Sequence, residues 1–470
     1  MLQGGMGARA QSFDDQRSKT MESMTFNRRT FLKSTAAAAA VLPTFNILSQ
    51  EANTIGPKDD QVNAAVIGYG AEGEILTDAA MKIPGVRFKA VCDIWDYRRK
   101  MARGRLRSLG HEVNVYEDYR EMLDKEDKNI DCVIIATPDW MHAEHTVYCL
   151  EHGKHVYCEK EMSNRLEKAK EMVLGQRRTG KILQIGHQRR SNPRYMHAIN
   201  RVIREAKMLG RVTHAYGQWN RSVAPFLTVR DRLNIPTETL QKYGYENMEQ
   251  FLNWRWFAKY GGGPMVDLGS HQIDLFFWVW DCVPVSVTAV GGNDYYNREM
   301  NDNVMAIYEF KTKEGVINRA YYQVLTTSSR GGFYEQFMGE NGSLTISEIA
   351  ARGNAVQREV RDGVPNWDQF AKMGLVLPVK KPVAATVTSN AAIDVRVTAE
   401  ADGWPLPVDL LKPAHMPHLE NFFLAVRRNK PELLTCPADL AYESAVAVLA
   451  ANRSVAERKT IYFKPEEFHV

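Results

Sequence analysis

Residues 63–73 read Asn-Ala-Ala-Val-Ile-Gly-Tyr-Gly-Ala-Glu-Gly, an apolar run that leads into the spacing G-x-G-x-x-G. The run predicts a strand and the residues after it a helix, which is the context in which this motif binds a dinucleotide. The first glycine permits a tight turn, the second lets a pyrophosphate approach the backbone, and the third lets the helix pack close to the strand. A helix N-terminus also favours an anion. A glycine-rich turn without a ligand is the alternative, but we expect a cofactor at the turn formed by Gly68, Tyr69, Gly70, Ala71, Glu72 and Gly73.

Two further segments are predicted at the same edge of the sheet. Asp93 ends the second predicted strand, about twenty residues after the turn, where its carboxylate can accept hydrogen bonds from both hydroxyls of an adenosine ribose. That arrangement disfavours a 2′-phosphate, so we expect NAD rather than NADP, although Arg98 and Arg99 lie close by in the sequence. A third strand ends at the same carboxyl edge and is followed by Thr137, Pro138 and Asp139.

Between residue 61 and about residue 185, strands and amphipathic helices alternate, a pattern typical of a parallel α/β sheet. The strands are predicted at Asn63–Ile67, Arg87–Cys92, Cys132–Ala136, His155–Cys158 and Ile182–Ile185. The helices between them are predicted at Gly73–Met81, Tyr97–Ser108, Met141–His152 and Arg165–Arg178. From about residue 211, β-rich runs predict an α+β domain with a largely antiparallel sheet and helices on one face. These runs are Arg211–Trp219, Val283–Gly291, Val304–Phe310, Val316–Leu325 and Phe333–Ile346.

The end of the chain is predicted to be helical again, at His418–Arg428 and Ala438–Arg453. Residues 350–410 are poorly periodic and rich in Pro, Val and charged residues, so we expect long loops there. Four regions follow from these patterns. They are a disordered leader and signal over 1–50, a dinucleotide-binding domain over 58–186, a substrate and oligomerisation domain over 187–430, and a closing helical segment over 431–470.

The N-terminal segment carries an export pattern. Residues 27–33 read Asn-Arg-Arg-Thr-Phe-Leu-Lys and open into the alanine run Ala36–Ala40 and a weakly apolar stretch through Leu48. This predicts a twin-arginine signal, whose machinery exports folded proteins, so we expect a periplasmic or otherwise exported protein. A leader that is not cleaved would tether it to the membrane. The alternative is an amphipathic or disordered N-terminus with chance arginines, and Met21 or Met24 is a second candidate start.

The bulk composition excludes several classes of protein. A net charge of +4 over 470 residues, with basic residues in scattered pairs, gives no sign of a nucleic-acid surface. No apolar run reaches the roughly 18 residues that cross a bilayer, so we expect a soluble protein after export. The six cysteines show no C-x-x-C pair and no zinc spacing, which favours small buried side chains over disulfides or metal ligands.

A helix predicted after the glycine run 261–263 carries Asp267, His271 and Asp274 at i, i+4 and i+7, on one helical face. Oxidation of an alcohol needs a base for the hydroxyl proton, and histidine titrates near neutral pH. A carboxylate one turn away can orient the histidine, and Lys160 can hydrogen-bond the same substrate oxygen. Two alternatives stay open, a metal bound by the Asp/His/Asp set and a plain polar helix face.

Together these segments resemble the Gfo/Idh/MocA oxidoreductase family, which includes glucose-fructose oxidoreductase and inositol dehydrogenase. The resemblance covers about residues 61–345 and the closing helices. It implies an N-terminal Rossmann domain with a doubly wound parallel sheet, and a C-terminal α+β domain whose open sheet builds homodimers or homotetramers. It rests on the glycine turn, Asp93, Ala-Thr-Pro-Asp at 136–139, His-Gly-Lys-His-Val-Tyr-Cys-Glu-Lys at 152–160, Ile-Gly-His-Gln-Arg-Arg at 185–190, and Gly-Gly-Gly-x-x-x-Asp-x-Gly-x-His-x-x-Asp at 261–274.

The resemblance also assigns roles to individual residues. It implies Lys160, Asp267 and His271 as the catalytic set, with His271 as the acid/base. We expect no metal, because the sequence shows no further cluster of ligands. The cofactor contacts expected in addition to the turn and the strand ends are His142, Glu159, Lys160 and Gln188.

One position departs from the family's pattern. The family usually has Glu-Lys-Pro, often with a cis bond before the proline, and this chain has Glu161 in place of the proline. Cis bonds are rare before other residues. Either the loop is reshaped or its surroundings hold the bond cis, and Glu161 is also placed to pair with Lys160.

Candidate sugar contacts lie in two segments. His187 and Arg189 follow the last strand of the first domain, where the family lines its pocket. Trp254 and Arg255 lead into the glycine run, and a tryptophan face suits the C–H face of a pyranose, although tryptophan pairs are more often core. The predicted substrate site is completed by Lys160, His271 and Asp274.

Export and an NAD site together constrain the reaction. Free NAD is scarce outside the cytoplasm, so an exported dehydrogenase that released NADH would stop after one turnover. We therefore expect oxidation of a sugar or glycoside hydroxyl with tightly bound, internally recycled NAD. Ping-pong transfer between two sugars, formation of a 3-keto-glycoside that feeds a lyase, and a redox-neutral glycosidase all fit. A nucleotide-bound sugar sensor or interaction protein without turnover is the alternative of another class.

Overall fold

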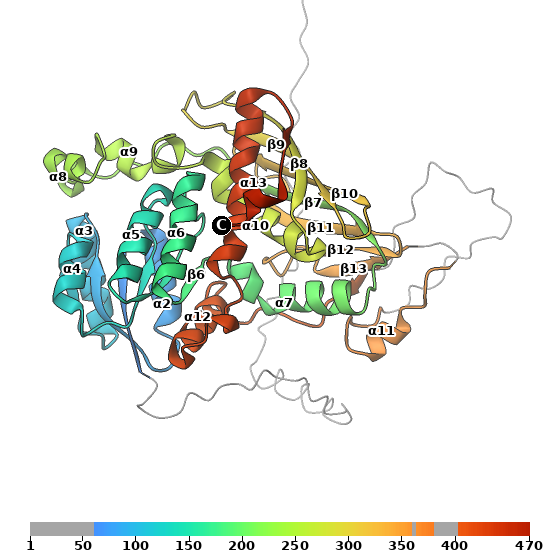
Figure 1. Ribbon diagram of the computed structural model, residues 1–470, viewed down its shortest axis with the longest axis horizontal. Helices are drawn as coiled ribbons and strands as arrows, with labels where there is room; N and C mark the ends of the chain where they lie inside the picture. Colours follow the sequence, from blue (N-terminus) through green and yellow to red (C-terminus); the bar gives the residue numbers. More distant parts are fainter. Residues whose placement is uncertain (1–60, 360–362, 380–402) are drawn as a thin grey trace, which may run out of the picture. The chain divides into compact units, whose positions relative to one another are not determined.

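The computed structural model describes residues 61–359, 363–379 and 403–470, and these form one compact unit (Figure 1). The predicted leader over 1–50 lies outside the described residues. So do residues 58–60 of the first predicted domain and residues 380–402 of the predicted long loops.

Within the described ranges, a six-stranded sheet forms the centre of the first domain, in the order β3-β2-β1-β4-β5-β6 with every neighbouring pair parallel. Helices cover both faces, so the central strands are almost wholly apolar and buried. The strand order reverses between β1 and β4, the point at which such sheets bind ligands at their carboxyl edge. The strands are β1 Val62–Ile67, β2 Val86–Cys92, β3 Asn114–Tyr116, β4 Cys132–Ile135, β5 His155–Cys158 and β6 Leu183–Ile185.

The helices of the first domain connect these strands in turn. The predicted α/β alternation is confirmed, with every predicted boundary within two residues of the observed one. Sequence patterns missed β3 and the helix after it, because a three-residue edge strand carries too little apolar periodicity to be recognised. The helices are α2 Ala71–Ala80, α3 Asp96–Ser108, α4 Tyr119–Glu126, α5 Asp139–Glu151 and α6 Leu166–Thr179.

A nine-stranded sheet forms the second domain, in the order β14-β13-β12-β11-β7-β10-β9-β8-β15. The predicted antiparallel character is confirmed, with β7 and β10 as the one parallel pair among the described strands of this second sheet. The predicted run Phe333–Ile346 is a hairpin of two strands. The strands are β7 Val212–Asn220, β8 Pro284–Gly292, β9 Asn303–Lys311, β10 Ile317–Leu325, β11 Phe333–Gly339, β12 Gly342–Ile346, β13 Ala355–Arg358, β14 Gly403–Pro405 and β15 Ile461–Tyr462.

The region 350–410 is more structured than the sequence suggested. Its described part contains the edge strands β13 and β14 and the short helix α11 (Asp368–Lys372). Trp367, just before α11, is fully buried and packs edge-on against Trp404 of β14, with ring centroids 6.2 Å apart. These elements are only three to five residues long, so no periodic pattern marked them.

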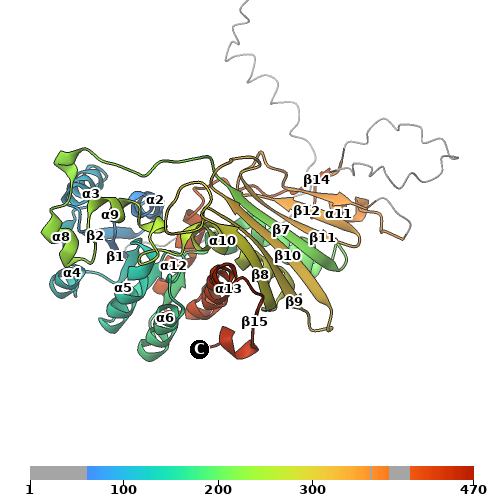
Figure 2. The same cartoon turned by 90° about the horizontal axis from the view of Figure 1, so that it is seen from above.

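Two long helices cover one face of the nine-stranded sheet (Figure 2). They are α10 (Gly263–Trp280) and α13 (Ala438–Glu457). Alternate residues of β9, among them Tyr308 and Phe310, point into this interface and are fully buried. The face of α13 is rich in buried alanines, and α13 also packs against α6 of the first domain. A helical segment, α7 (Pro193–Met196) with the π-helical turns His197–Glu205, leads from the first domain into β7.

The helix α12 (Met416–Arg428) belongs to the core of the first domain. Its side chains Leu419, Phe422 and Phe423 are fully buried in the cluster that contains β1 and α2. The ring of Phe422 lies 5.8 Å from that of Tyr157 on β5. The region 187–430, predicted as one substrate domain, therefore returns to the first domain near its end, because the apolar face of α12 needs the cover that α2 and β5 supply.

The cysteines agree with the prediction of small buried side chains. None of the six forms a disulfide, and all but Cys282, which is half-buried, are buried. No helix among residues 61–359, 363–379 and 403–470 has the length and apolar character that a bilayer crossing demands.

Replacing Phe422 tests how far α12 stabilises the first domain. Phe422→Ala opens a cavity in a fully buried cluster and is expected to lower the free energy of unfolding by about 3–5 kcal/mol. Leu411→Ala is the matched control, because Leu411 is 93% exposed and its loss should cost less than about 0.5 kcal/mol. Denaturant unfolding followed by circular dichroism measures both. Equal effects in the two variants would show that α12 is not part of the core.

Candidate functional site

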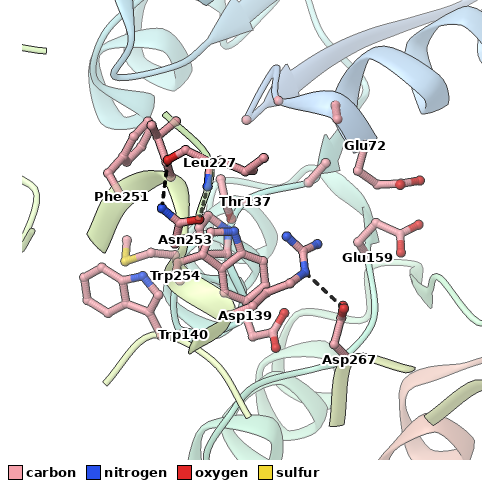
Figure 3. A pocket seen from close by; sticks show the side chains of 18 of the residues that line it. Glu72, Thr137, Asp139, Trp140, Glu159, Leu227, Phe251, Asn253, Trp254 and Asp267 are labelled. Carbon is pink, nitrogen blue, oxygen red and sulfur yellow. Dashed lines mark hydrogen bonds and ion pairs between the residues drawn. The ribbon is translucent and has the colours of Figure 1, made fainter. Parts of the chain in front are cut away.

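A cavity of about 1060 Å³ lies between the carboxyl edge of the first sheet and α10 of the second domain. Its third wall is the connection between β7 and α10, residues 221–262, which we call the β7–α10 connection. This segment contains α8 (Thr237–Lys242), α9 (Met248–Leu252) and the 3-10 turns Asp231–Leu233 and Trp254–Trp256. Figure 3 shows the labelled lining side chains gathered around one space, among them Glu72, Asp139, Glu159, Trp254 and Asp267.

The glycine turn has the geometry that a pyrophosphate requires. Gly68 has a φ of 89°, and a Cβ on Gly73 would lie 2.0 Å from the carbonyl oxygen of Gly68, so neither position accepts a side chain. A Cβ on Gly70 would meet no atom within 4 Å, which leaves open space next to the backbone. The helix α2 begins after Gly70 without a side-chain cap. The N–H groups of its first turn are therefore available to an anion, and a dinucleotide fits.

Asp93 is held at the edge of the cavity by two backbone donors. The N–H of Tyr69 donates to Oδ2 at 2.7 Å and the N–H of Trp95 donates to Oδ1 at 2.8 Å. Burial raises the pKa of Asp93, although these hydrogen bonds and the nearby charge of Arg98 oppose it. Because both oxygens are oriented by the glycine turn and by the start of α3, an adenosine ribose can be received between them.

Lys160, Asp267 and His271 come together at the other end of the cavity. The Nζ of Lys160 donates to the carbonyl oxygen of Asp267 at 2.7 Å and lies 3.4 Å from Oδ1. The Nε of Arg255 lies 3.1 Å from Oδ2 of the same carboxylate (Figure 3). Burial pushes the pKa of Asp267 upward, but the charges of Arg255 and Lys160 outweigh it and hold the pKa below its ordinary value. Asp267 is therefore ionised.

His271 is neutral in this setting. Burial, and then the charges of Lys160 and Arg189, hold the pKa of His271 well below its ordinary value. Its Nδ1 is buried and has no hydrogen-bond partner among the described residues. Its ring lies 5.2 Å from the ring of Trp219 at the end of β7. A neutral imidazole at the cavity can accept a proton from a bound hydroxyl group.

Two further carboxyl groups that line the cavity have raised pKa values. Burial, and then the negative charge of Asp267, raise the pKa of Asp139 to about 7. Burial, and then the charge of Glu72, raise the pKa of Glu159 above its ordinary value. Glu72, Glu159 and His415 offer ligand atoms within 4.8 Å of one another, close enough to surround a cation.

The loop after Lys160 settles the expectations for Glu161. The peptide bond between Lys160 and Glu161 is cis. The expected pairing of Glu161 with Lys160 is wrong, because the lysine turns to Asp267 and the glutamate turns inward. Glu161 is fully buried, its Oε1 accepts from the N–H of Met162 at 2.7 Å, and its Oε2 has no partner. Burial raises the pKa of Glu161 to about 8.

Most predicted site residues line the cavity, and some lie behind it. The lining includes Gly68, Gly70, Ala71, Glu72, Asp93, Thr137, Pro138, Asp139, Glu159, Lys160, Gln188, Trp254, Arg255, Asp267 and His271. Tyr69 and Gly73 support the turn from beneath. His142 bridges the loops instead, with its ring nitrogens 2.6 Å from the carbonyl oxygen of Glu161 and 2.7 Å from that of Thr137.

Three predicted substrate residues are outside the lining. Arg189 is buried in ion pairs with Glu335 at 2.5 Å and Glu348 at 3.0 Å. Asp274, two turns along α10 from Asp267, is paired with Arg190 at 2.8 Å. Both side chains are therefore committed to neighbours within the second domain. The third, His187, is fully buried, and neither of its ring nitrogens has a partner among the described residues.

The metal alternative for the Asp/His/Asp set is not supported by these contacts. Asp267 is paired with Lys160 and Arg255, and Asp274 is paired with Arg190. A cation bound between them would have to displace three positive side chains.

Several lining residues were missed by sequence reasoning. Trp219 and Arg221 stand at the end of β7, and this position directly after a predicted strand was the available signal. Tyr243 and Tyr245 of the β7–α10 connection, and His415 just before α12, carried no signal. Their place depends on segments that fold back over the first domain.

Comparisons with known proteins agree with this architecture. Residues 62–187 match the family described as an oxidoreductase family with an NAD-binding Rossmann fold, and residues 198–345 match the Gfo/Idh/MocA C-terminal domain. The chain is 30% identical over 315 residues to the inositol 2-dehydrogenase of Rubrobacter xylanophilus, covering 65% of this chain and 78% of that protein. It is 27% identical over 306 residues to the scyllo-inositol 2-dehydrogenase (NAD(+)) of Bacillus subtilis, covering 64% and 72%.

Solved structures share the fold at lower identity. The scyllo-inositol dehydrogenase of Lactobacillus casei, solved with bound NAD(H) and scyllo-inositol, superimposes with a TM-score of 0.58 at 17% identity. The match covers 86% of this chain and 99% of that one. The myo-inositol 2-dehydrogenase of Lactobacillus plantarum gives a TM-score of 0.59 at 22% identity and covers 86% and 100%.

Glu161 predicts a specific pH dependence of stability. Its pKa is raised in the folded protein, so the native state holds a proton that the unfolded chain releases above its own pKa of about 4.3. The free energy of unfolding therefore falls as the pH rises from about 4.3 to about 8. Glu161→Gln should reduce this fall by about 2–4 kcal/mol, measured as denaturant unfolding at intervals between about pH 5 and about pH 9.

A matched control separates this effect from a change of net charge. Glu167→Gln removes the same charge from an exposed position on α6 and should keep the pH profile of the wild type. If Glu161→Gln and Glu167→Gln show the same profile, Glu161 is not the group that titrates.

Proposed function

The chain belongs to the Gfo/Idh/MocA oxidoreductase family, and on that premise we propose that it oxidises a hydroxyl group of a sugar or glycoside with NAD that stays bound and is recycled. The observation that carries the proposal is the placement of Lys160, Asp267 and His271 in the same cavity as the glycine turn. The first domain is an NAD-binding Rossmann domain. The relatives named above act on inositols, which are polyhydroxylated rings like sugars.

In the proposed reaction, His271 acts as the base. Because its pKa lies well below its ordinary value, the imidazole is unprotonated at neutral pH and takes the proton of the substrate hydroxyl. Lys160 donates a hydrogen bond to the same oxygen and stabilises its developing negative charge. Asp267 fixes the lysine in place through its carbonyl oxygen and carboxylate. When bound, NAD supplies the acceptor for the hydride that leaves the substrate carbon.

Two features support the proposal that NAD is retained, the predicted export signal and the β7–α10 connection. The twin-arginine pattern at residues 27–33 predicts export to a compartment in which free NAD is scarce, so the cofactor must be kept through successive turnovers. The β7–α10 connection supports the same idea, because it forms a wall over the Asp93 end of the cavity. Figure 1 and Figure 2 show α8 and α9 of this connection lying beside the helices of the first domain.

The connection is held to the first domain by a separate aromatic cluster. Trp95, Ile235, Leu240, Tyr245 and Tyr260 are buried together. The indole N–H of Trp95 donates to the carbonyl oxygen of Leu233 at 2.6 Å, and that of Trp140 donates to the hydroxyl of Tyr245 at 3.2 Å. Opening the wall would expose this cluster to water, which opposes release of whatever lies beneath it.

The proposal extends to location and assembly. We expect a periplasmic or otherwise exported protein that forms a homodimer or homotetramer through the nine-stranded sheet. The sheet face opposite α10 and α13 exposes Val290 of β8, Met305 and Ile307 of the neighbouring β9, and Met338 of β11. An apolar surface of this kind is typical of a protein–protein contact.

The role of His271 is tested with the cofactor that copurifies. Wild-type protein should carry NAD without supplementation, and a suitable glycoside should raise the absorbance of reduced nicotinamide once, in proportion to the bound cofactor. His271→Ala should slow this burst about 100- to 10,000-fold while leaving the NAD content unchanged. A burst of wild-type rate in the variant would remove His271 from the role of base.

Cofactor retention is tested by loosening the connection. Tyr245→Ala removes a buried ring of the aromatic cluster and should speed the loss of NAD during dialysis roughly tenfold. Tyr308→Ala is the control, because it removes a buried tyrosine in the second domain, away from the cavity lining. If both variants lose NAD equally fast, loss of global stability and not the wall explains the release.

A further inference from the structure

An arginine that was not among the predicted site residues lies at the reacting end of the cavity. Arg221 directly follows β7 and lines the cavity with an exposed side chain. Its guanidinium lies 5.4 Å from the ring centroid of Trp219, whose ring lies 5.2 Å from that of His271. Within the described part of the chain, the side chain of Arg221 makes no hydrogen bond or ion pair. Its charge is therefore available to a ligand next to the proposed base.

Arg255 reaches the same end of the cavity from the β7–α10 connection. Its Nε is used by Asp267 at 3.1 Å, and its guanidinium stacks on the ring of Trp254 at 4.2 Å. The side chain is 47% exposed. Its terminal nitrogens have no partner among residues 61–359, 363–379 and 403–470. A guanidinium held in this way by a carboxylate and a ring presents its two free N–H edges in a fixed orientation.

The charges around the two arginines leave a positive surplus. The negative charge of Asp267 is shared by Lys160 and Arg255, so it balances one of the three cations. Burial raises the pKa values of Asp139 and Glu159, which also lie near Lys160, so these carboxyl groups carry less negative charge at neutral pH than ordinary ones. Glu72 faces His415 at 3.2 Å. An anion on the substrate would compensate the surplus.

The phosphates of the cofactor would bind at the glycine turn and do not need Arg221 or Arg255. The open space at Gly70 and the uncapped start of α2 provide backbone donors at the glycine turn. Arg221 and Arg255 both come from the β7–α10 connection and line the same cavity.

We propose that the substrate is an acidic sugar, a hexuronic acid or its glycoside, whose carboxylate is bound by Arg221 and Arg255. Planar guanidinium groups match the geometry of a carboxylate and make charge-assisted hydrogen bonds with it. The inference rests on the proposed function, because it names the substrate class of that same site.

The test compares sugars that differ only at C6. D-Glucuronate is paired with D-glucose, and D-galacturonate with D-galactose, each titrated calorimetrically into the holoenzyme as purified. In at least one pair the uronate should bind about 10- to 100-fold more tightly, the range expected for hydrogen bonds to a charged group. The absorbance of reduced nicotinamide is recorded on the same samples and reports turnover independently.

Variants of Arg221 test whether this arginine causes the preference for uronates over neutral sugars. Arg221→Gln should reduce the preference for the uronate to within about threefold, and Arg221→Lys should keep part of it because the charge remains. Arg103→Gln removes an exposed arginine of α3 outside the cavity lining and should keep the full preference. The NAD content of Arg221→Gln should equal that of the wild type.

Each contrary outcome has its own meaning. Equal or weaker binding of the uronate in both pairs overturns the acidic-sugar proposal, as does a loss of NAD from Arg221→Gln, which would assign this arginine to the cofactor. Reduction of bound NAD by the neutral sugars with equal efficiency overturns it too but leaves the proposed oxidoreductase function intact. A clear preference for uronates without any reduction of NAD leaves the carboxylate site intact and overturns the proposed function.

Discussion

The ion-pair chain from Lys160 to Asp267 to Arg255 is the contact on which the site depends. Lys160 comes from the loop after β5, Asp267 from α10 and Arg255 from the β7–α10 connection, so one carboxylate ties together the three walls of the cavity. Removing Asp267 would leave the largely buried Lys160 without its anionic partner, which typically costs about 3–5 kcal/mol. The chemistry at the cavity can therefore be positioned only when both domains and the connection are in place.

The ion pairs among Lys160, Asp267 and Arg255 also determine which side chains at the cavity are charged. Asp267 stays ionised because it has two cationic partners, whereas burial favours the neutral forms of Asp139, Glu159 and Glu161, whose oxygens lack such partners. The positive charge of Lys160 in turn disfavours the imidazolium form of His271. A neutral base next to a cationic donor is the combination that removal of a hydroxyl proton needs. The protonation states around the cavity thus follow from one well-paired carboxylate among several poorly paired ones.

Sequence reasoning succeeded where the signal is local. The glycine turn, Asp93 and the alternation of strands and helices depend on spacing within one βαβ unit, and the observed boundaries agree with the patterns. It failed where a side chain chooses between distant partners. Arg189 and Asp274 lie in segments that were predicted to line the pocket. In the structure, Arg189 forms an ion pair with Glu335 and Asp274 forms one with Arg190. His415 and α12 join the first domain only because an apolar helix face meets α2, and no local pattern reports that.

The β7–α10 connection links the cover over the Asp93 end of the cavity to the position of Arg255 at the reacting end. Its helices α8 and α9 cover the Asp93 end of the cavity, and its last turn supplies Trp254 and Arg255 at the reacting end. Asn253, which holds the N–H and the carbonyl of Leu227 at 2.7 and 3.0 Å, fastens the two parts to each other (Figure 3). A movement large enough to free a ligand at the Asp93 end would therefore disturb Arg255 and, through Asp267, Lys160. Because a closed wall and a complete set of polar contacts require the same packing, the two ends of the cavity open and close together, as the proposed retention of the cofactor requires.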